Sequence, residues 1–391
     1  MRDRILALFF AMLVQLCYSQ ADRTAEIQRL INNAKKGSVV DGQNKTFYVT
    51  SLWLKSDMTL RNFKFISLPT SESDVSILNI GNDLSTNRFN SSGEAKQAFS
   101  ASQYAPGIQN IIIENVTIDG NRKNHTAREI RDGGKHGISI KGFNNNIHIK
   151  NVNVKNCVTD GIAIYRGLHT SLEHEAFATR NIVLDNIIAS NNRRHGGSGD
   201  SIQNFLCKNS TFNNNGRDSA GNMSGAKGAV FSNAPYGNGW DMEGYGLGSP
   251  LQNIVFHNCT FLDNAASGLL FYDTVDQNVP HFLPRNNIKI SNSRLNAGFR
   301  NPSGNYALIF TSSIENKKSA RKLYSNISVT NSILYGKLLL RSAENITLTD
   351  VQINSGEPLE GLIDYTDNVR SYNGTNRKTI NWEIYNGKSI Q

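Results

Sequence analysis

A short pattern of alternating apolar and polar positions recurs along the chain. Each copy begins with Asn or Asp, has apolar residues one and three positions later, and carries a second Asn or Asp at the fifth position. Small or apolar residues follow at the sixth and eighth positions. The copies begin at Asp57, Asn110, Asn146, Asn181, Asn204, Asn253, Asn287, Asn326 and Asn345. Alternation with a period of two predicts β-strands rather than helices.

The repeat predicts a stacked architecture. Its copies begin between 19 and 53 residues apart, and a single strand of this kind cannot bury its apolar face alone. Neighbouring copies must therefore pack on one another. A strand that bends at the same Asn in every coil is typical of a parallel β-helix. We predict an all-β solenoid in which residues 22–391 form one domain.

The second Asn of each copy defines a column along this solenoid. The column comprises Asn115, Asn151, Asn186, Asn209, Asn258, Asn292 and Asn331. We expect these side chains to form an inward ladder whose amides bond the backbone of adjacent coils. Three of them, Asn115, Asn209 and Asn258, also fit the N-x-[ST] pattern of N-linked glycosylation. A buried ladder predicts that these three carry no glycan.

The two ends of the solenoid differ in pattern. In TAEIQRLINNAKK, residues 24–36, the apolar residues Ile27, Leu30 and Ile31 have helical spacing. We predict a short helix that covers the open end of the first coil, because an uncovered terminal coil would expose its core. From about Ser371 the chain is polar, and we expect irregular structure there.

A second repeated segment lies between copies of the first. It reads HGISIKG, DGIAIYR, HGGSGDS, NGWDMEG and SGLLFYD in successive coils. The segments align on Gly137, Gly161, Gly196, Gly239 and Gly268. Strand alternation then places Ile138, Ile162, Trp240 and Leu269 inside, and the residues three and five positions after the first residue of each segment outside.

The outward side chains of this second strand should form one patch, because neighbouring parallel strands lie about 4.8 Å apart. The patch contains Lys141, Tyr165, Asp200, Asp241, Glu243 and Tyr272. Its edge contains His136, Asp160, Arg194 and His195. The glycine-rich run RRHGGSGDSIQN at 193–204, together with Trp240, predicts a low floor on which a ligand can lie.

These features resemble the pectate-lyase-like superfamily of single-stranded, right-handed parallel β-helix proteins. RRHGGSGDSIQNF followed by NGWDMEG is similar to bacterial members with an R-Q-G-I-S type strand and then G-I-D-I-E. VTDGIAIY and RHGGS resemble the N-T-D-G and G-H-G strands of polygalacturonase-type glycosidases. The chain departs from that glycosidase pattern, since Val158 replaces the Asn and both the Asp pair and the R-I-K triplet are missing. The resemblance implies cleavage or epimerisation of a polysaccharide.

Hydrolysis of a glycoside needs an acid and a base or nucleophile, usually two carboxyl groups. Asp241 and Glu243 lie about 6.6 Å apart along one strand, near the lower limit for inverting enzymes. Asp200 and Glu243, on adjacent coils, approximate the shorter separation of retaining enzymes. We expect Glu243 to act as acid and Asp241 as base, with Asp200 assisting. His195 and Arg194 would orient the sugar or stabilise charge, and this reaction requires no cofactor.

Elimination or epimerisation on an acidic polysaccharide is the alternative reaction. It needs a base beside a uronate and a group that neutralises the carboxylate. The residues available for these roles are Lys141, Tyr165, Arg194 and His195. The resemblance allows a Ca²⁺-dependent lyase, whose ligands would be Asp200, Asp241 and Glu243. The basic net charge favours an anionic substrate, whereas the number of carboxyl groups favours hydrolysis.

The other patch residues are expected to bind substrate. They are Arg194, Lys141, Tyr165, Asp160, Tyr272 and His136, of which His136 alternatively caps a turn. A non-catalytic glycan-binding or adhesion solenoid is a further alternative, although an adhesin does not need stacked acidic groups on a strand. The long insertions at 83–109, 167–180, 214–237 and 273–286 would shape a groove beside the strands in either case.

Composition narrows the class of partner. The net charge of +9 allows a polyanionic partner, but the basic residues form no helix or aromatic-basic cluster typical of nucleic-acid modules. We therefore expect a polysaccharide rather than nucleic acid, and a monomer. The mature chain keeps Cys157, Cys207 and Cys259, an odd number that argues against a disulfide framework. We expect two of them to face the core as inert thiols.

The first residues resemble a targeting segment. MRDR precedes the apolar run ILALFFAMLVQLCYS, and small residues follow up to Ala21. This pattern predicts that residues 1–21 are a secretory signal peptide, too short for a stable membrane span. We predict a secreted or periplasmic protein with no membrane-spanning segment.

Overall fold

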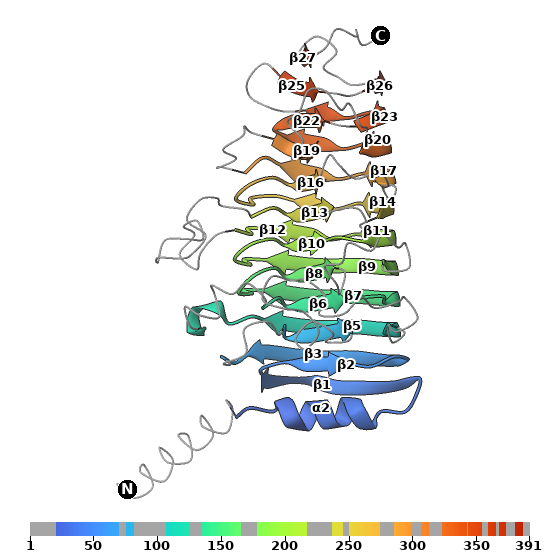
Figure 1. Ribbon diagram of the computed structural model, residues 1–391. Coiled ribbons are helices and arrows are strands. Elements are labelled where there is room, and N and C mark those ends of the chain that lie inside the picture. Colours follow the sequence, from blue (N-terminus) through green and yellow to red (C-terminus); the bar gives the residue numbers. More distant parts are fainter. Residues whose placement is uncertain are drawn as a thin grey trace, which may run out of the picture.

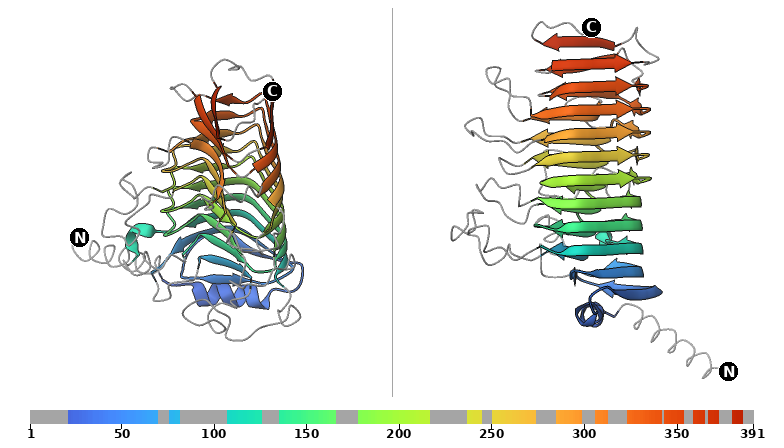
Figure 2. Two further views of the ribbon diagram at one scale, coloured as in Figure 1. Left: turned by 45° about the horizontal axis from the view of Figure 1, so that its top comes forward. Right: turned by 90° about the vertical axis from the view of Figure 1, so that its right-hand side faces the viewer.

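The computed structural model shows strands stacked in coils from one end of the molecule to the other (Figure 1). It describes residues 21–69, 76–81, 107–125, 135–165, 178–216, 237–244, 250–273, 285–298, 306–312, 323–341, 343–353, 359–364, 367–372 and 380–385. The strand pairings between successive coils are parallel throughout these residues, which confirms the predicted parallel β-helix. The right-hand view of Figure 2 shows the strands as a regular stack.

The described strands form two sheets. Sheet A has 16 strands: β1 (Ser38–Val49), β3 (Met58–Ser67), β5 (Gln109–Asp119), β7 (Asn145–Lys155), β9 (Thr179–Ser190), β11 (Ile202–Lys208), β12 (Thr211–Asn213), β14 (Leu251–His257), β15 (Thr260–Phe261), β17 (Arg285–Ser291), β18 (Arg294–Asn296), β20 (Tyr324–Thr330), β21 (Ile333–Tyr335), β23 (Ala343–Thr349), β24 (Gln352–Ile353) and β26 (Asp367–Tyr372). Sheet B has 11 strands: β2 (Leu52–Leu54), β4 (Leu78–Gly81), β6 (Ile138–Lys141), β8 (Ile162–Tyr165), β10 (Gly197–Gly199), β13 (Trp240–Gly244), β16 (Leu269–Asp273), β19 (Tyr306–Ser312), β22 (Lys337–Arg341), β25 (Leu359–Asp364) and β27 (Ile380–Tyr385).

The first repeat builds sheet A, and its Asn columns mark the bends. The residues that open each copy and those at its fifth position have positive φ, for example 57° at Asn110 and 55° at Asn115. Asn tolerates this left-handed conformation better than most residues do. After β9 the bend at the fifth position divides each coil into two strands, since the continuous β9 pairs with both β11 and β12. The predicted bend is therefore confirmed.

The predicted direction of the second Asn column is wrong. Asn115, Asn151, Asn186 and the column members after them are exposed. The amides of Asn151, Asn186, Asn209 and Asn258 donate to side chains of the preceding coil rather than to the backbone. The Nδ2 of Asn151 donates to Asn115 at 3.0 Å, and the Nδ2 of Asn186 donates to Asn151 at 2.9 Å. A left-handed residue at a bend turns its side chain outward. The burial argument against glycosylation at the N-x-[ST] triplets is therefore lost.

A true inward ladder lies one corner further along each coil. Asn192, Asn215 and Asn264 are buried, and each accepts a hydrogen bond from the backbone of the preceding coil. The Nδ2 groups of Asn215 and Asn264 donate to the carbonyls of Ala189 and Phe212. The sequence signal was an Asn directly after the left-handed Asn or Asp of that corner.

The predicted capping helix is confirmed as α2 (Thr24–Asn33), which covers the first coil (Figure 1). Ile27 and Ile31 are buried against the core, whereas Leu30, which shares their spacing, is exposed. The Gln28 side chain accepts a hydrogen bond from the N–H of Trp53 at 2.8 Å and donates to its carbonyl at 3.0 Å. This pairing satisfies the edge of β2, the first strand of sheet B, which would otherwise be open.

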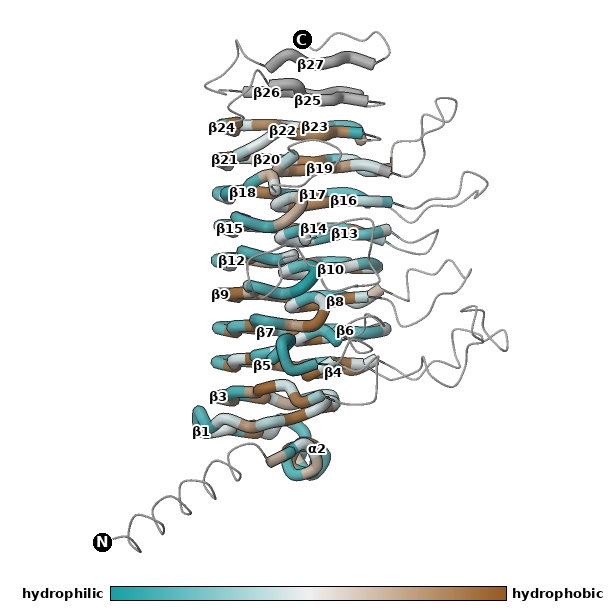
Figure 3. Tube along the Cα trace, turned by 90° about the vertical axis from the view of Figure 1, so that its left-hand side faces the viewer, coloured by the Kyte–Doolittle hydropathy of each residue, from teal (hydrophilic) through white to brown (hydrophobic). Residues whose placement is uncertain are grey.

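Apolar side chains alternate inward along the strands whose burial is described, for example at Ile147 and Ile149 of β7. Figure 3 shows hydrophobic and hydrophilic positions interspersed along the stacked coils. Aromatic residues stack through the interior, including Phe271 on Phe310 with ring centroids 4.5 Å apart. Trp240 points into this core and touches Phe205 and Phe212. Trp240 is therefore not part of a ligand-binding floor.

The glycine-rich run also serves the interior. Gly197 pairs directly with Trp240, and a Cβ at Gly197 would overlap the Trp240 ring. A Cβ at Gly199 would approach Ile202 and Met242. The glycines thus make room for large neighbours inside the coil, and the expected role as a low outer floor is wrong.

The structure also tests some of the expectations about the cysteines and the two ends of the chain. Cys157, Cys207 and Cys259 are free and buried, so all three rather than two face the core. The chain after Ser371 is not irregular throughout, since β27 (Ile380–Tyr385) pairs with β25. The predicted signal peptide, apart from Ala21, and most of the insertions lie outside the described residues. No helix in the described part of the chain is long and apolar enough to cross a membrane.

Candidate active site

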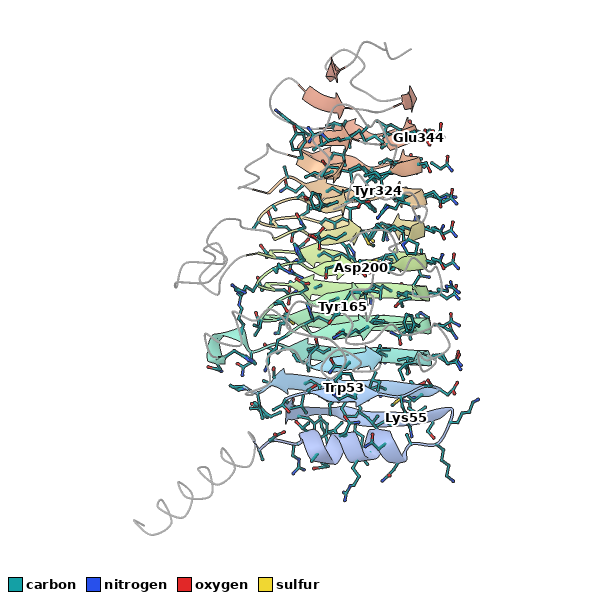
Figure 4. All side chains as sticks on the ribbon, in the orientation of Figure 1. Trp53, Lys55, Tyr165, Asp200, Tyr324 and Glu344 are labelled. Carbon is teal, nitrogen blue, oxygen red and sulfur yellow. The ribbon has the colours of Figure 1, made fainter. Side chains whose placement is uncertain are left out.

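The second repeat forms sheet B in the predicted register. Gly161 donates its N–H to the carbonyl of His195, Gly196 to Asn238, and Gly239 to Ser267, each across neighbouring coils. The three glycines therefore occupy equivalent places. The pairing of Gly199 with Ile164 and Met242 sets Asp200 beside Tyr165 on one side and Glu243 on the other. Figure 4 labels Tyr165 and Asp200 on adjacent coils.

Asp160 is the buried centre of a hydrogen-bond network. Its Oδ1 accepts from Arg194 Nε at 2.8 Å and from the His195 backbone N–H at 3.0 Å. Its Oδ2 accepts from Arg194 Nη2 at 2.6 Å and from Ser198 Oγ at 2.7 Å. Burial opposes ionisation, but the Arg194 charge and these hydrogen bonds outweigh it and hold the pKa of Asp160 well below its usual value.

Arg194 connects this buried centre to the surface. Its guanidinium binds both oxygens of Asp160, while 42% of its side chain remains exposed. Burial alone would lower the pKa of Arg194, but the charges of Asp160 and then Glu243 raise it. The cation is therefore permanent, fixed in orientation and close to both candidate catalytic carboxyl groups.

His195 links the network to Asp241. Its Nδ1 accepts the backbone N–H of Asn238 at 3.1 Å, and its Nε2 lies 3.2 Å from Asp241 Oδ2. An acceptor Nδ1 places the proton of a neutral imidazole on Nε2, which then donates to Asp241. Burial, with the nearby Arg194 and His136 charges, lowers the pKa of His195 to about 3. His195 is thus a neutral donor, and neither nitrogen is left to orient a sugar.

Asp241 has the opposite electrostatics to Asp160. It is only 4% exposed, and burial, followed by the charge of Glu243, raises its pKa well above the usual value. Its Oδ2 faces His195 Nε2 and accepts from Asn238 Nδ2 at 3.3 Å. Its Oδ1 has no hydrogen-bond partner among the described residues. Burial thus favours the neutral form of this carboxyl group, in which Oδ1 is the place for the proton.

A row of side chains crosses successive coils of sheet B next to Asp241. Glu243 follows on the same strand, is half-buried, and pairs in register with Tyr272. Asp200 lies beside Glu243 and is buried. Lys141 pairs with Tyr165, and its Nζ lies 5.5 Å from the centre of the Tyr165 ring. The structure thus brings all six predicted patch residues onto one face of sheet B.

His136 lies beneath the surface of the patch, next to Asp160 and Tyr165. It is buried, its Nδ1 lies 3.3 Å from Asp160 Oδ2, and its ring lies 5.9 Å from that of Tyr165. Sequence reasoning missed Asn238 and Ser198, which bond the two key aspartates. Asn238 could have been found, because it occupies the same first position in its segment as Asp160 and His195 do.

Within the described ranges, no group of three or more His, Cys, Asp or Glu side chains is arranged to hold a metal ion. Asp200, Asp241 and Glu243 face a common region. The Oδ2 of Asp241 there contacts His195 and Asn238. The calcium alternative stays a prediction.

No protein-family model and no curated protein sequence matches the chain, but solved structures do. The family 28 exopolygalacturonase of Yersinia enterocolitica matches at 14% identity and a TM-score of 0.45, covering 90% of this chain and 75% of that one. The Streptococcus pneumoniae surface adhesin PfbA matches at 14% and 0.46, covering 90% and 89%. The A-module of the Azotobacter vinelandii mannuronan C-5 epimerase AlgE4 matches at 12% and 0.35, covering 95% and 96%.

These likenesses concern the fold alone. The chain has a parallel β-helix fold, which its own strand pairing establishes. The three matched proteins are named as a glycosidase, an adhesin and an epimerase. A fold does not determine an activity, so the activity has to be argued from the site.

Proposed function

We propose that the protein is a carbohydrate-active enzyme that hydrolyses a glycosidic bond of a polysaccharide, with Asp241 as general acid and Glu243 as general base. The observation that carries the proposal is the buried Asp241 carboxyl group, whose pKa is raised beside Glu243 on the same strand. Such enzymes usually have two carboxyl groups in different surroundings, so that one is protonated and the other is ionised.

The hydrogen bonds define the acid. Asp241 Oδ2 faces the donors of His195 and Asn238, so the proton of the neutral carboxyl group belongs on Oδ1. From there it can be donated to the oxygen of the leaving sugar. Because Oδ1 is buried, substrate binding has to open access to it. This assignment reverses the roles expected from the sequence, where Glu243 was the acid.

The strand geometry defines the base. Residues two apart on a strand lie about 6.6 Å apart, which falls at the lower end of the separation that leaves room for a water molecule in inverting enzymes. Glu243 is the more exposed of the pair and would activate that water. We therefore expect inversion at the anomeric carbon.

The neighbouring side chains would bind sugar units. Arg194, fixed by Asp160, keeps 42% of its side chain exposed, and its charge acts on both catalytic carboxyl groups. Tyr272 lies beside Glu243 and Tyr165 beside Asp200, so both offer aromatic surfaces next to an acidic side chain. Lys141 lies beyond Tyr165. Asp200 would bind hydroxyl groups next to Glu243.

Elimination or epimerisation at a uronate is the second candidate function. The exposed part of Arg194 favours it, because a fixed guanidinium is suited to binding a substrate carboxylate. His195 would not supply the base, since its Nδ1 accepts the Asn238 N–H and its Nε2 carries the proton. The two reactions differ in product, because only elimination leaves an unsaturated uronate.

The test is an assay of the full chain on a panel of neutral and acidic polysaccharides. Reducing ends without ultraviolet absorbance would identify hydrolysis, and proton NMR of the first products would show inversion. Glu243→Gln should abolish turnover. Glu114→Gln, on the outer face of sheet A, is the matched control and should keep it. Unsaturated products, or full activity of Glu243→Gln, would overturn the proposal.

A further inference from the structure

A cavity of about 650 Å³ lies away from the carboxyl groups of sheet B. It opens at the carboxyl ends of β1, β3, β5 and β7 in sheet A, next to the 3₁₀ helix η2 (Arg122–Asn124), the short teal coil at the left of Figure 1. Its volume falls within the range of small-molecule sites, about 300–1,000 Å³. None of the patch residues of sheet B lines it.

One wall of the cavity is fixed by hydrogen bonds. Asn121, which has a left-handed φ of 48°, donates its N–H to Asp119 Oδ1 and its Nδ2 to the carbonyl of Ser67, both at 2.9 Å. Asn156 Nδ2 donates to the same Asp119 oxygen at 3.1 Å, and Asn124 Nδ2 to Asn121 Oδ1 at 2.7 Å. The wall is therefore formed before any ligand arrives, which reduces the entropic cost of binding.

The charge of the lining favours an anion. Arg122 and Lys123 line the cavity, and Asp119 is the one acidic side chain among its described lining residues. The Asp119 carboxylate already accepts two hydrogen bonds and lies 3.8 Å from Lys155 Nζ. Arg193, whose charge interacts with that of Arg122, adds to the positive potential. Burial, followed by the Arg122 charge, lowers the pKa of Arg193 to about 10, so Arg193 is still a cation at neutral pH.

Part of the lining is apolar. Leu68 and Tyr48, both half-buried, and the exposed Pro69 line it. A cavity lined by both amide groups and an aromatic and aliphatic surface matches a sugar ring, which has a hydroxyl rim and an apolar face. An inorganic anion would use only the charged wall.

We propose that this cavity is a second glycan-binding site that takes an acidic sugar unit, with its carboxylate toward Arg122 and Lys123 and its apolar face on Tyr48. The site holds a glycan without cleaving it. It does not require that the sheet B carboxyl groups be catalytic.

The test measures binding to the full chain with three probes: galacturonic acid, galactose and sodium sulfate. Ligand-observed NMR and calorimetry should show that galacturonic acid binds at least tenfold more tightly than galactose, as expected for about one charge-assisted hydrogen bond. Lys123→Ala, at an exposed position, should weaken it severalfold, and Arg122→Gln should weaken it about tenfold or more. Tyr48→Ala should weaken the sugar but not sulfate.

Three outcomes would overturn the proposal: galactose binding as tightly as galacturonic acid, sulfate binding as tightly as the sugar acid, or binding unchanged in both Lys123→Ala and Tyr48→Ala. These two variants keep the test valid if Arg122→Gln does not fold. Glu243→Gln should retain the binding in full, so failure of the hydrolase proposal and failure of this one are distinguishable. Lys123→Ala should in turn leave cleavage of short oligosaccharides unchanged.

Discussion

The outer faces of sheets A and B share a backbone but differ in what surrounds their charges. On sheet A, Lys208 lies 3.3 Å from Asp185, and both side chains are partly in water. On sheet B, the Asp160 side chain that binds Arg194 is fully buried, and that of Asp241 is 5% exposed beside His195. Equally short contacts thus occur in two very different dielectric environments.

The difference shows that burial, rather than pairing, separates the candidate site from the scaffold. Water screens the charge pairs of sheet A, so such pairs contribute little to the free energy of unfolding. On sheet B the same chemistry moves pKa values in opposite directions, down for Asp160 and up for Asp241. Opposed protonation states in neighbouring carboxyl groups are a property of catalytic sites.

The largest expected effect is on catalysis. Asp241→Asn should lower turnover of a natural polysaccharide by about 10²–10⁴-fold, because the leaving oxygen loses its proton donor. An aryl glycoside with an acidic phenol needs no such proton, and its hydrolysis should be affected far less. Kinetics on both substrates measure the difference.

Two controls sharpen this result. Glu243→Gln should suppress both substrates equally, because the attacking water is needed for each. Asp185→Asn, on sheet A, should change neither. Equal losses with both substrates in Asp241→Asn would remove Asp241 from the role of acid.

The second effect is on stability. Asp160→Asn should lower the free energy of unfolding by about 3 kcal/mol, because Arg194 loses its charged partner at a buried site. Asp185→Asn should cost less than about 1 kcal/mol, since its bridge to Lys208 is screened. Denaturant titrations of the two variants compare the faces directly, and equal costs would contradict the role given to burial.

The third effect is on pH dependence. The pKa of His195 falls from 6.5 to about 3 on folding, so below pH 6.5 the unfolded chain binds a proton that the folded chain does not. Stability should therefore fall toward acid, by up to about 1.4 kcal/mol per pH unit from this group. Asp241, with its raised pKa, opposes part of this loss.

The contribution of His195 is isolated by substitution. His195→Gln should flatten the dependence of stability on pH between 6.5 and about 4. His257→Gln, on the outer face of sheet A, should keep the slope of the parent protein. Chemical denaturation at several pH values measures both, and an unchanged slope in His195→Gln would show that His195 is not held neutral.

The smallest effect concerns the exposed Asn column of sheet A. Asn151→Gly should cost less than about 1 kcal/mol, because it removes solvent-exposed hydrogen bonds and keeps the left-handed backbone easily. Asn151→Ala should cost about 1 kcal/mol more, because a Cβ opposes this conformation. Thermal unfolding measures the pair. A Gly variant less stable than the Ala variant would mean that the side-chain ladder matters more than the bend.

The register of both sheets could be predicted from sequence, because it depends on local signals. Asn at each bend and the glycine of each sheet B segment align the coils regardless of insertion length, so Asp200 and Glu243 could be placed side by side. Once this register is set, the outward row from Lys141 to Tyr272 follows from strand alternation.

Other features depend on direction and solvent, which the pattern does not encode. The left-handed φ turned Asn151 outward, and Gly197 proved to be a space for the Trp240 ring. The roles of Asp241 and Glu243 could not be ordered, because their exposures differ only once the coil is folded. The first coil, β1, was missed because its sequence lacks the opening Asn.

The most direct test of the account is the protonation state of Asp241. Carbon-13 NMR of the labelled carboxyl group should give a pKa above the ordinary 3.8, which falls in Glu243→Gln because a neighbouring negative charge is removed. A pKa at or below 3.8, or one that does not respond to Glu243→Gln, would contradict the claim that sheet B holds a neutral acid beside a charged base.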